Sequence, residues 1–507
     1  MRSTFMGLET SKSGLFLQQT ALYTTGHNIS NANTAGYSRQ RVNMQSLPGF
    51  SYPGLNSAKL PGHLGTGAEA HSIQRVRDQF IDRQYRQETN SLGYWEAQTK
   101  SISQMEDIMT EPSEYGINQS FTDFWKSMED IVANPKDTAA RQVMLSKGQA
   151  LAESFNYIDT QLKKIQGNIG NEIKVSTNEV NSILKQIASI NKQIQKVEPN
   201  GYVTNDLYDA RDVLVDQLST YLPITTEQVK SGGNASDVAE GTLTIYYNGV
   251  ELVNGKNYAQ LSTLDAEGDP VDGGVDDEAT NGYSEFGKIT ISEVGEPPED
   301  TVASEIEYAD MDKGKGKLKS LIDAYGHSGG QGVYPEMLAN LNKLAAEFVK
   351  EFNTAHNAGY GLDGSTGVDF FTGTTAKDIA VAITDPKQIA ASDEDGEEGN
   401  NKNILLLAKL QSKVQDNLNG GTFQSYYESL VGDLGVKGQE AVREAYNAAT
   451  LRLSIENDRA SVSSVSLDEE MTNMITFQQA YNANARMITV VDETLDKIIN
   501  GMGRVGL

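Results

Sequence analysis

Both ends of the chain carry a narrow apolar stripe with heptad spacing. Near the start the stripe consists of Leu8, Leu15, Leu22 and Ile29, with Phe5 beside it. Near the end, steps of four and three residues connect Leu467, Met471, Met474, Gln478, Tyr481, Ala485, Ile488, Asp492, Leu495, Ile499 and Met502, and nine of these eleven are apolar. Heptad spacing is typical of helices that pack along a seam. The sequence therefore predicts a helix of the coiled-coil type at each end.

A helix with so narrow an apolar face needs a partner, because an isolated helix is only marginally stable in water. One interpretation is an internal helical pair within a single domain. The other is a pair that also packs on adjoining chains, and the position of both stripes at the extreme termini favours it. We therefore predict an assembly interface formed by Phe5, Leu8, Leu15, Leu22, Ile29, Leu467, Met471, Met474, Tyr481, Ile488, Leu495 and Ile499.

The rest of the chain is expected to form an elongated body with a smaller β-rich insert. Residues 138–198 keep helical spacing, which would give about 90 Å of helix at 1.5 Å per residue, although Gly167 and Gly170 could interrupt it. Further helices are expected at 75–110, 205–220, 335–357, 402–418 and 438–463. Residues 226–316 instead show alternating patterns and Asn-Gly turns, which are typical of β-hairpins.

These observations predict a mainly α, elongated, multi-domain rod with three parts. The paired terminal helices would take residues 1–45 and 466–507, and the long-helix body would take 46–225 and 317–465. The β-rich domain would be inserted at 226–316. A chain of 507 residues is long enough for several domains.

Composition narrows the classes of function. The formal net charge of −27 disfavours nucleic acid and anionic membranes as partners. There is no cysteine, and the five histidines show no zinc-binding spacing. No apolar run is long enough for a membrane span or a standard signal peptide. We therefore expect no catalytic, cofactor-binding or metal-binding residues and no membrane insertion.

Two acidic stretches with glycine, at residues 265–282 and 393–399, are weak candidates for calcium loops. A calcium loop requires acidic ligands at alternating positions, with glycine at the sixth position and a distal glutamate. In the second stretch the glycine, Gly396, comes too early. We interpret both stretches as solvated loops.

The strongest local signal is the asparagine-rich segment that follows the first stripe, from Asn28 to Gln40. Asparagine tolerates left-handed backbone and bonds to its own chain neighbours, so such a run ends a helix in a defined way. The order Asn28-Ile29-Ser30-Asn31-Ala32-Asn33-Thr34-Ala35-Gly36-Tyr37 resembles the signature of the bacterial flagellar rod, hook and hook-associated axial family. The signature residues are Asn28, Asn31, Asn33, Gly36, Tyr37 and Arg39.

The resemblance spans nearly the whole chain except the β-rich insert. The ending Gly36-Tyr37-Ser38-Arg39-Gln40 is similar to the hook-associated members rather than to hook or rod proteins. The closing segment, from Ser466 to Met471 and on through Gln478 to Arg486, looks like the last helix of the family.

What the resemblance implies is a structural, extracellular subunit of the flagellum at the junction between hook and filament, with no enzymatic activity. Its partners would be copies of itself, the hook protein and the filament-side junction protein. The subunit would leave the cytoplasm through the flagellar export channel, with its ends ordered only on assembly. An export chaperone would hold the last helix, for which we predict the anchors Met471, Met474, Ile488 and Val491.

Three alternatives stay open at this point. The chain could be another axial protein, such as the hook or distal rod protein, because these share the terminal signature. It could be a secreted adhesin or effector that presents the insert, or an enzyme attached to a rod subunit.

Overall fold

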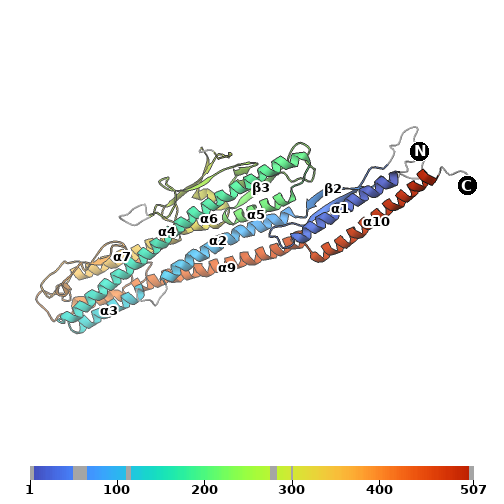
Figure 1. Cartoon of the computed structure of the whole chain (residues 1–507). Coiled ribbons are helices and arrows are strands. Elements are labelled where there is room, and N and C mark those ends of the chain that lie inside the picture. Colours follow the sequence, from blue (N-terminus) through green and yellow to red (C-terminus); the bar gives the residue numbers. More distant parts are fainter. Residues whose placement is uncertain (1–4, 50–64, 110–115, 275–282, 299–300, 502–507) are drawn as a thin grey trace.

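The computed structural model describes residues 5–49, 65–109, 116–274, 283–298 and 301–501, and within them the chain is an elongated, mainly helical rod (Figure 1). The prediction of this fold class is confirmed. The helices are α1 Met6–Ser30, α2 Gln79–Met109, α3 Ile117–Ala133, α4 Thr138–Val197, α5 Asn205–Tyr221, α6 Lys317–Tyr325, α7 Val333–Asn357, α8 Lys402–Lys409, α9 Phe423–Ser463 and α10 Leu467–Gly501. Short 3-10 turns connect several of them, including η2 at Tyr308–Lys313.

The strands form four small antiparallel sheets. One hairpin joins β1 Gln40–Ser46 and β2 Ala68–Arg75, and another joins β10 Phe371–Thr372 and β11 Ala380–Val381. The insert holds the other two sheets, ordered β3-β4-β5-β6 and β7-β8-β9. Their strands are β3 Ile224–Val229, β4 Thr242–Tyr247, β5 Val250–Asn254, β6 Asn257–Tyr258, β7 Leu261–Asp265, β8 Phe286–Ser292 and β9 Val302–Glu307.

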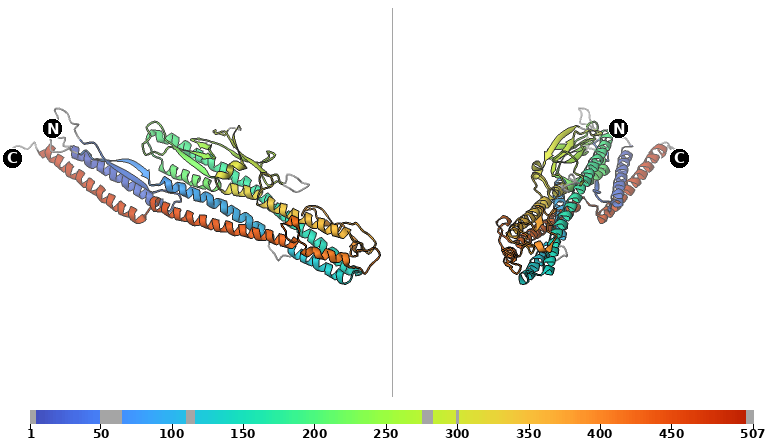
Figure 2. Two further views of the ribbon diagram at one scale, coloured as in Figure 1. Left: turned by 180° about the vertical axis from the view of Figure 1, so that it is seen from behind. Right: turned by 90° about the vertical axis from the view of Figure 1, so that its left-hand side faces the viewer.

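The body is built around α4, a single helix of 60 residues. Asp137 begins it by accepting a hydrogen bond from the backbone amide of Ala139, and it ends before Pro199 and Gly201, whose φ of 89° is left-handed. Figure 2 shows α2 and α9 side by side along the rod, with α3, α7 and the start of α4 gathered at the end opposite the termini. That end encloses a cluster of aromatic rings from Phe121, Phe124, Trp125, Phe348, Phe352, Phe370 and Phe371.

The two glycines that could have interrupted α4 lie inside the unbroken helix. A Cβ on Gly167 would come within 2.2 Å of the Tyr283 hydroxyl, and one on Gly170 within 2.8 Å of the Gly273 amide nitrogen. Both positions are therefore points where the insert approaches the helix closely. Asn181 and Asn191 fix the same contact farther along, because their side-chain amides bond to the backbone of Leu261 and Leu243.

Several expected boundaries were wrong. The helix expected at 402–418 ends at Lys409, because Asp416–Leu418 form a 3-10 turn and Asn419 takes a left-handed φ of 55°. Helix α9 begins at Phe423 instead of 438, where Thr422 and Ser425 form a reciprocal cap. Helix α3 and the β1–β2 hairpin were not expected. For α3 the signal was present, since Phe121, Phe124, Met128 and Ile131 have helical spacing and are buried. The hairpin is harder to recognise, because its strands are polar and mostly half-buried or exposed.

The approach of the insert to α4 predicts a position-dependent cost for adding one methyl group. Gly170→Ala should destabilise the body by about 1–3 kcal/mol, because the new Cβ would overlap the backbone of Gly273. The matched control is Gly432→Ala on α9, where nothing lies within 4 Å. There, alanine should stabilise the helix by roughly 0.5–1 kcal/mol. Urea unfolding followed by circular dichroism measures both changes, and equal effects would contradict this account of Gly170.

Candidate functional site at the base of the terminal helices

Helices α1 and α10 run antiparallel with one constant register (Figure 1). A Cβ on Gly7 would lie 3.5 Å from Val491, and one on Gly14 would lie 3.0 Å from Asn484. At the other end of the pair, the Asn28 amide donates to Glu470 at 3.1 Å. Each step of seven residues forward on α1 thus matches seven residues backward on α10.

The closest approach on α1 is made by Gly7, Gly14, Ala21 and Asn28, each one position before a residue of the predicted stripe. Small residues there let the two backbones come close. Leu8, Leu15, Leu22 and Ile29 are half-buried on the flank of this seam, and the β1–β2 hairpin also packs on α1. Phe5 is exposed. Gly7, Gly14 and Asn28, which the structure places against α10, are thus each one position before a residue of the predicted stripe.

The predicted stripe on α10 divides into two sets. Met474, Tyr481, Ile488 and Leu495 share a face with Glu470, Asn484 and Val491, so this set lies toward α1. Leu467, Met471 and Ile499 stay exposed, at 47%, 50% and 69% of their full surface. Of the predicted chaperone anchors, Met474, Ile488 and Val491 therefore share the buried face, and Met471 does not.

The signature loop after α1 is organised by Asn28, which is 1% exposed. Its side-chain oxygen accepts from the Gln40 amide at 3.0 Å and from the Tyr37 hydroxyl at 2.8 Å, and its amide group donates to the Gln40 carbonyl at 2.8 Å. The Tyr37 hydroxyl also lies 2.9 Å from His27 Nδ1. Burial, together with Asp206, Asp209 and Glu470, raises the pKa of Tyr37, so it stays a neutral donor.

Gly36 is required in this loop for two reasons. Its φ is 78°, in the left-handed region, and a Cβ there would lie 2.1 Å from Val213 of α5. Asn31 continues the turn by donating from its side chain to the His27 carbonyl at 3.0 Å, and Asn33 is exposed. The signature residues therefore shape how the chain leaves α1.

Arg39 fastens the loop to the start of α10. Its Nε donates to Glu470 at 2.8 Å, and its Nη1 lies 2.9 Å from Glu469. Its backbone amide donates to the carbonyl of Ser463, at the end of α9. Because Glu470 also accepts from Asn28, one carboxylate links the two terminal helices and the loop.

Beneath the loop lies a group of ten interlocked charges, here called the joint cluster. It consists of Arg75, Arg77, Arg86, Arg211 and Arg459 with Asp82, Asp209, Asp212, Asp216 and Glu240. Arg75 bonds Asp209 at 2.8 Å and Asp212 at 2.7 Å, and Arg459 of α9 reaches Asp82 and Asp216. The cluster thus joins β2, α2, α5, α9 and the insert.

Asp212 is the centre of the joint cluster. Burial acts to raise the pKa of its carboxyl, but Arg75, Arg77, Arg211 and Arg86 outweigh burial and hold that pKa well below its usual range. The signature loop reaches the cluster through Ser38, whose amide and hydroxyl both donate to Asp209, at 2.9 and 2.7 Å. The terminal helices are therefore attached to the body through a largely buried network of ion pairs.

Sequence reasoning missed this cluster. A detectable signal existed, because Asp209, Asp212 and Asp216 follow helical spacing and Arg75 and Arg77 alternate on one face of an extended segment. However, three acidic residues on one helix face and two arginines far away in the sequence do not by themselves reveal that they meet.

One group of acidic residues among those described has the spacing of a possible metal site. Asp265, Glu267 and Asp269 are near enough to share an ion, but an Asp265 oxygen already accepts from the amides of Glu267, Gly268 and Asp269, as in an ordinary turn. That turn agrees with the solvated loop expected there, although residues 275–282 of the stretch lie outside the described residues. Among the described helices, none is long and apolar enough to cross a membrane.

Comparison with known proteins assigns both ends of the chain to one class. Residues 8–37 match the model of the flagella basal body rod protein family. Residues 459–501 match that of the flagellar basal body rod FlgEFG protein C-terminal family. The paired terminal helices and the signature loop are thus those of a flagellar axial protein.

The body identifies the family within that class. Residues 102–371 match the flagellar hook-associated protein FlgK helical domain. The chain is 42% identical to flagellar hook-associated protein 1 of Bacillus subtilis strain 168, over 99% of both chains. It is 26% identical to the protein of that name from Escherichia coli K12, over 97% of this chain and 99% of the relative. The chain belongs to the flagellar hook-associated protein 1 family.

A solved structure supports the fold. The flagellar hook junction protein FlgK from Burkholderia pseudomallei superposes with a TM-score of 0.62 at 14% identity, over 75% of this chain and 100% of that chain. Likeness at such low identity concerns the fold alone, and it agrees with the helical rod described above.

The joint cluster predicts a large effect of one neutralising substitution. Asp212→Asn should destabilise the protein by about 3–5 kcal/mol, because it leaves buried arginines without their shared partner. Asp206→Asn, at a largely exposed carboxylate that meets His27 at 3.7 Å, should cost no more than about 1 kcal/mol. Chemical unfolding at neutral pH measures both, and equal costs would contradict the central role of Asp212.

The stability of the folded protein should also depend on pH through Asp212. The folded-state pKa of Asp212 lies below the unfolded value, so its stabilisation is present above the unfolded carboxyl pKa. It is lost as pH falls from that value through the lower folded one. Asp212→Asn should therefore flatten the decline of stability below about pH 4.

Proposed function

We propose that the chain is a structural subunit of the bacterial flagellum that forms the junction between hook and filament and catalyses no reaction. Its two rod-family ends, paired as α1 and α10 and held to the body by the joint cluster, are the observation that carries this proposal. Relatives named flagellar hook-associated protein 1 match the chain over nearly its full length.

The exposed side of α10 supports contacts with neighbouring subunits. Leu467, Met471 and Ile475 follow one another at four-residue steps and are each about half-exposed. Phe16 and Tyr23 of α1 are also more than half-exposed. Apolar side chains in such numbers on a two-helix unit need covering surfaces, and copies of the chain or of other axial proteins arranged in a tube would supply them.

Ordering of the ends on assembly is part of the proposal. The principal partner of α10 is α1, and the α1 side of their seam carries Gly7 and Gly14, so the large apolar side chains of this seam come from α10 and remain partly exposed. A two-helix unit of this kind gains little free energy when alone. Export through the flagellar channel and extracellular assembly would then place the ordering step at the growing tip, next to the hook protein and the filament-side junction protein.

A chaperone for the last helix fits the same picture. Met474, Ile488 and Val491 lie on the face of α10 that packs toward α1, so a groove-shaped chaperone holding that face would keep the two helices apart before export. Met471, on the exposed flank, would extend the same contact.

The alternatives are less well supported. Similarity to a flagellar hook protein, from Helicobacter pylori strain 26695, is 26% over 33% of this chain. The match to flagellar hook-associated protein 1 covers 99% of it. An adhesin or an attached enzyme would require a binding or catalytic surface in the insert. The insert instead packs on α4, where Asn181 and Asn191 bond to the backbone of Leu261 and Leu243.

A charge placed in the helix seam tests the junction role. Ile488→Asp, on the face of α10 toward α1, and Leu22→Asp, on the half-buried flank of α1, should leave the body folded but prevent assembly, because each places an unpaired carboxylate where the terminal helices bury apolar surface. Cells would then release filament subunits into the medium rather than retain them. The matched control, Ile488→Leu, keeps the apolar surface and should support filaments. Normal filaments on both aspartate variants would contradict the proposal.

Removal of the last helix tests the chaperone. A chain that ends at Ser466 lacks all four predicted anchors and should lose at least about a hundredfold in affinity for the export chaperone. Isothermal titration with the purified chaperone measures this loss. A second variant, Ile475→Asp, alters the exposed flank only and should bind nearly as the parent does. Full affinity of the truncated chain would exclude α10 as the binding segment.

A further inference from the structure

A large cavity lies where the insert meets the helical body. It encloses about 900 Å³ between α2, the connection from α5 to β3, the β4–β5 turn and the segment after η2. Its lining includes Arg83, Asn90, Leu222, Ile224, Tyr247 and Lys315. We call this cavity the insert groove. Its volume lies in the range of pockets that take ligands of a few hundred Å³, so a few side chains of a partner would fit in it.

Two cations in the insert groove have no carboxylate partner within 4.0 Å among the described residues. Arg83 uses its Nε on the carbonyl of Gln79, and Lys315 Nζ lies 4.8 Å above the Trp95 ring. Arg86, on the same helix and also in the groove, is instead paired with Asp212 and Asp216. Both cations are therefore available to an acidic partner at this cavity.

Acidic charge also touches the groove, since Asp310 is part of its lining. The carbonyl of Asp310 accepts from the Asn248 side chain, which fixes this segment beside the β4–β5 turn. One carboxylate does not balance Arg83 and Lys315, so the groove favours an acidic occupant.

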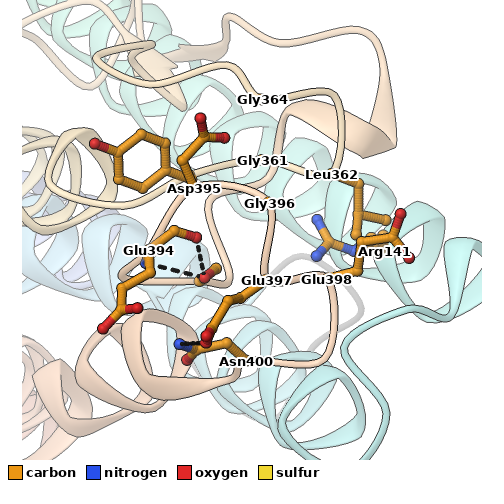
Figure 3. Close-up of a pocket in the computed structure, with 12 residues that line it drawn as sticks. Arg141, Gly361, Leu362, Gly364, Glu394, Asp395, Gly396, Glu397, Glu398 and Asn400 are labelled. Atoms are coloured by element: carbon orange, nitrogen blue, oxygen red, sulfur yellow. Dashed lines mark hydrogen bonds between the residues drawn. The ribbon is translucent and has the colours of Figure 1, made fainter.

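An acidic segment with unpaired charge lies at the opposite end of the rod. Residues Asp393–Glu398 form an exposed loop, in which Asp393 pairs with Lys402 and Glu398 with Lys136. Glu394 and Asp395 pair with no cation within 4.0 Å among the described residues. Figure 3 places Arg141 across a small pocket from Glu394, and that guanidinium is committed to the carbonyls of Pro135 and Ile389.

We propose that the acidic loop Asp393–Glu398 of one copy docks in the insert groove of the next copy. The loop lies at the end of the rod away from the termini (Figure 2), whereas the groove is lined by α2 and the insert. The contact therefore joins two molecules. Arg83 and Lys315 would receive Glu394 and Asp395, whose charges complement them.

The contact is heterologous, because two different surfaces meet. Contacts of this kind propagate along an open assembly instead of closing a dimer. The inference rests on the proposed function, in that it supplies an axial contact outside the terminal helices for a subunit of the flagellar junction.

A disulfide between copies tests the inference. Because the chain has no cysteine of its own, any disulfide must form between the two introduced residues. The full chain carries Gln87→Cys in the groove and Gly399→Cys beside the loop, which leaves every charge of both surfaces in place. Flagella isolated from cells expressing this chain are oxidised and separated without reductant. We expect a ladder of linked chains, whereas either single-cysteine variant gives none.

Charge reversal provides the second measurement. Arg83→Glu with Lys315→Glu, in the double-cysteine chain, should reduce the linked fraction about tenfold. Adding Glu394→Lys and Asp395→Lys should restore much of it. Whether the cells keep their filaments, rather than release filament subunits into the medium, measures the junction role independently of the disulfide. Retained filaments without a ladder would overturn this docking and leave the proposed function standing, and a ladder insensitive to charge reversal would overturn the ionic recognition.

Discussion

The attachment of the terminal helices depends on Asp212 and the arginines around it. Four guanidinium groups lower the pKa of this one buried carboxyl despite the desolvation that opposes ionisation. A buried network of this kind adds little net stability compared with apolar packing, yet it fixes geometry strongly, since removing one partner strands the others. The angle between the terminal pair and the body is therefore set by directional bonds instead of by apolar contact.

The signature loop connects this network to the helix pair. Ser38 reaches Asp209, Arg39 reaches Glu469 and Glu470, and Asn28 binds the loop backbone on both sides. The loop thus holds α1, α10 and the body together, and we call it the bracket; Asn28, Ser38 and Arg39 each make a bond that this contact needs. Because the bracket holds the start of α10 against the end of α1, the exposed apolar residues of both helices are presented in one orientation. A subunit that must fit between two different neighbours requires these apolar residues to be held in a fixed orientation.

Apolar packing and charge have separate tasks along the rod. The aromatic cluster around Phe348 stabilises the end away from the termini, and the glycines of α4 admit the insert at close range. Arg83 and Glu394 form no ion pair within the part of the chain that the structure describes, and both are exposed, so a second molecule can reach them. The terminal pair has a thin seam and an uncovered outer face, which suits a part that is completed by its neighbours.

The sequence by itself determined the helical ends, the long central helix and the signature, because heptad spacing and helix breakers act over a few neighbouring residues. It also carried the resemblance that indicated an axial protein. Only the tertiary structure decided which side of each stripe meets its partner, since Gly14 and Leu15 differ by one step and both satisfy the same period. It also decided the joint cluster, because Arg75 and Asp209 are 134 residues apart and nothing local records their contact. Long-range pairing of charge depends on where whole elements are placed in space, and local patterns do not encode that placement.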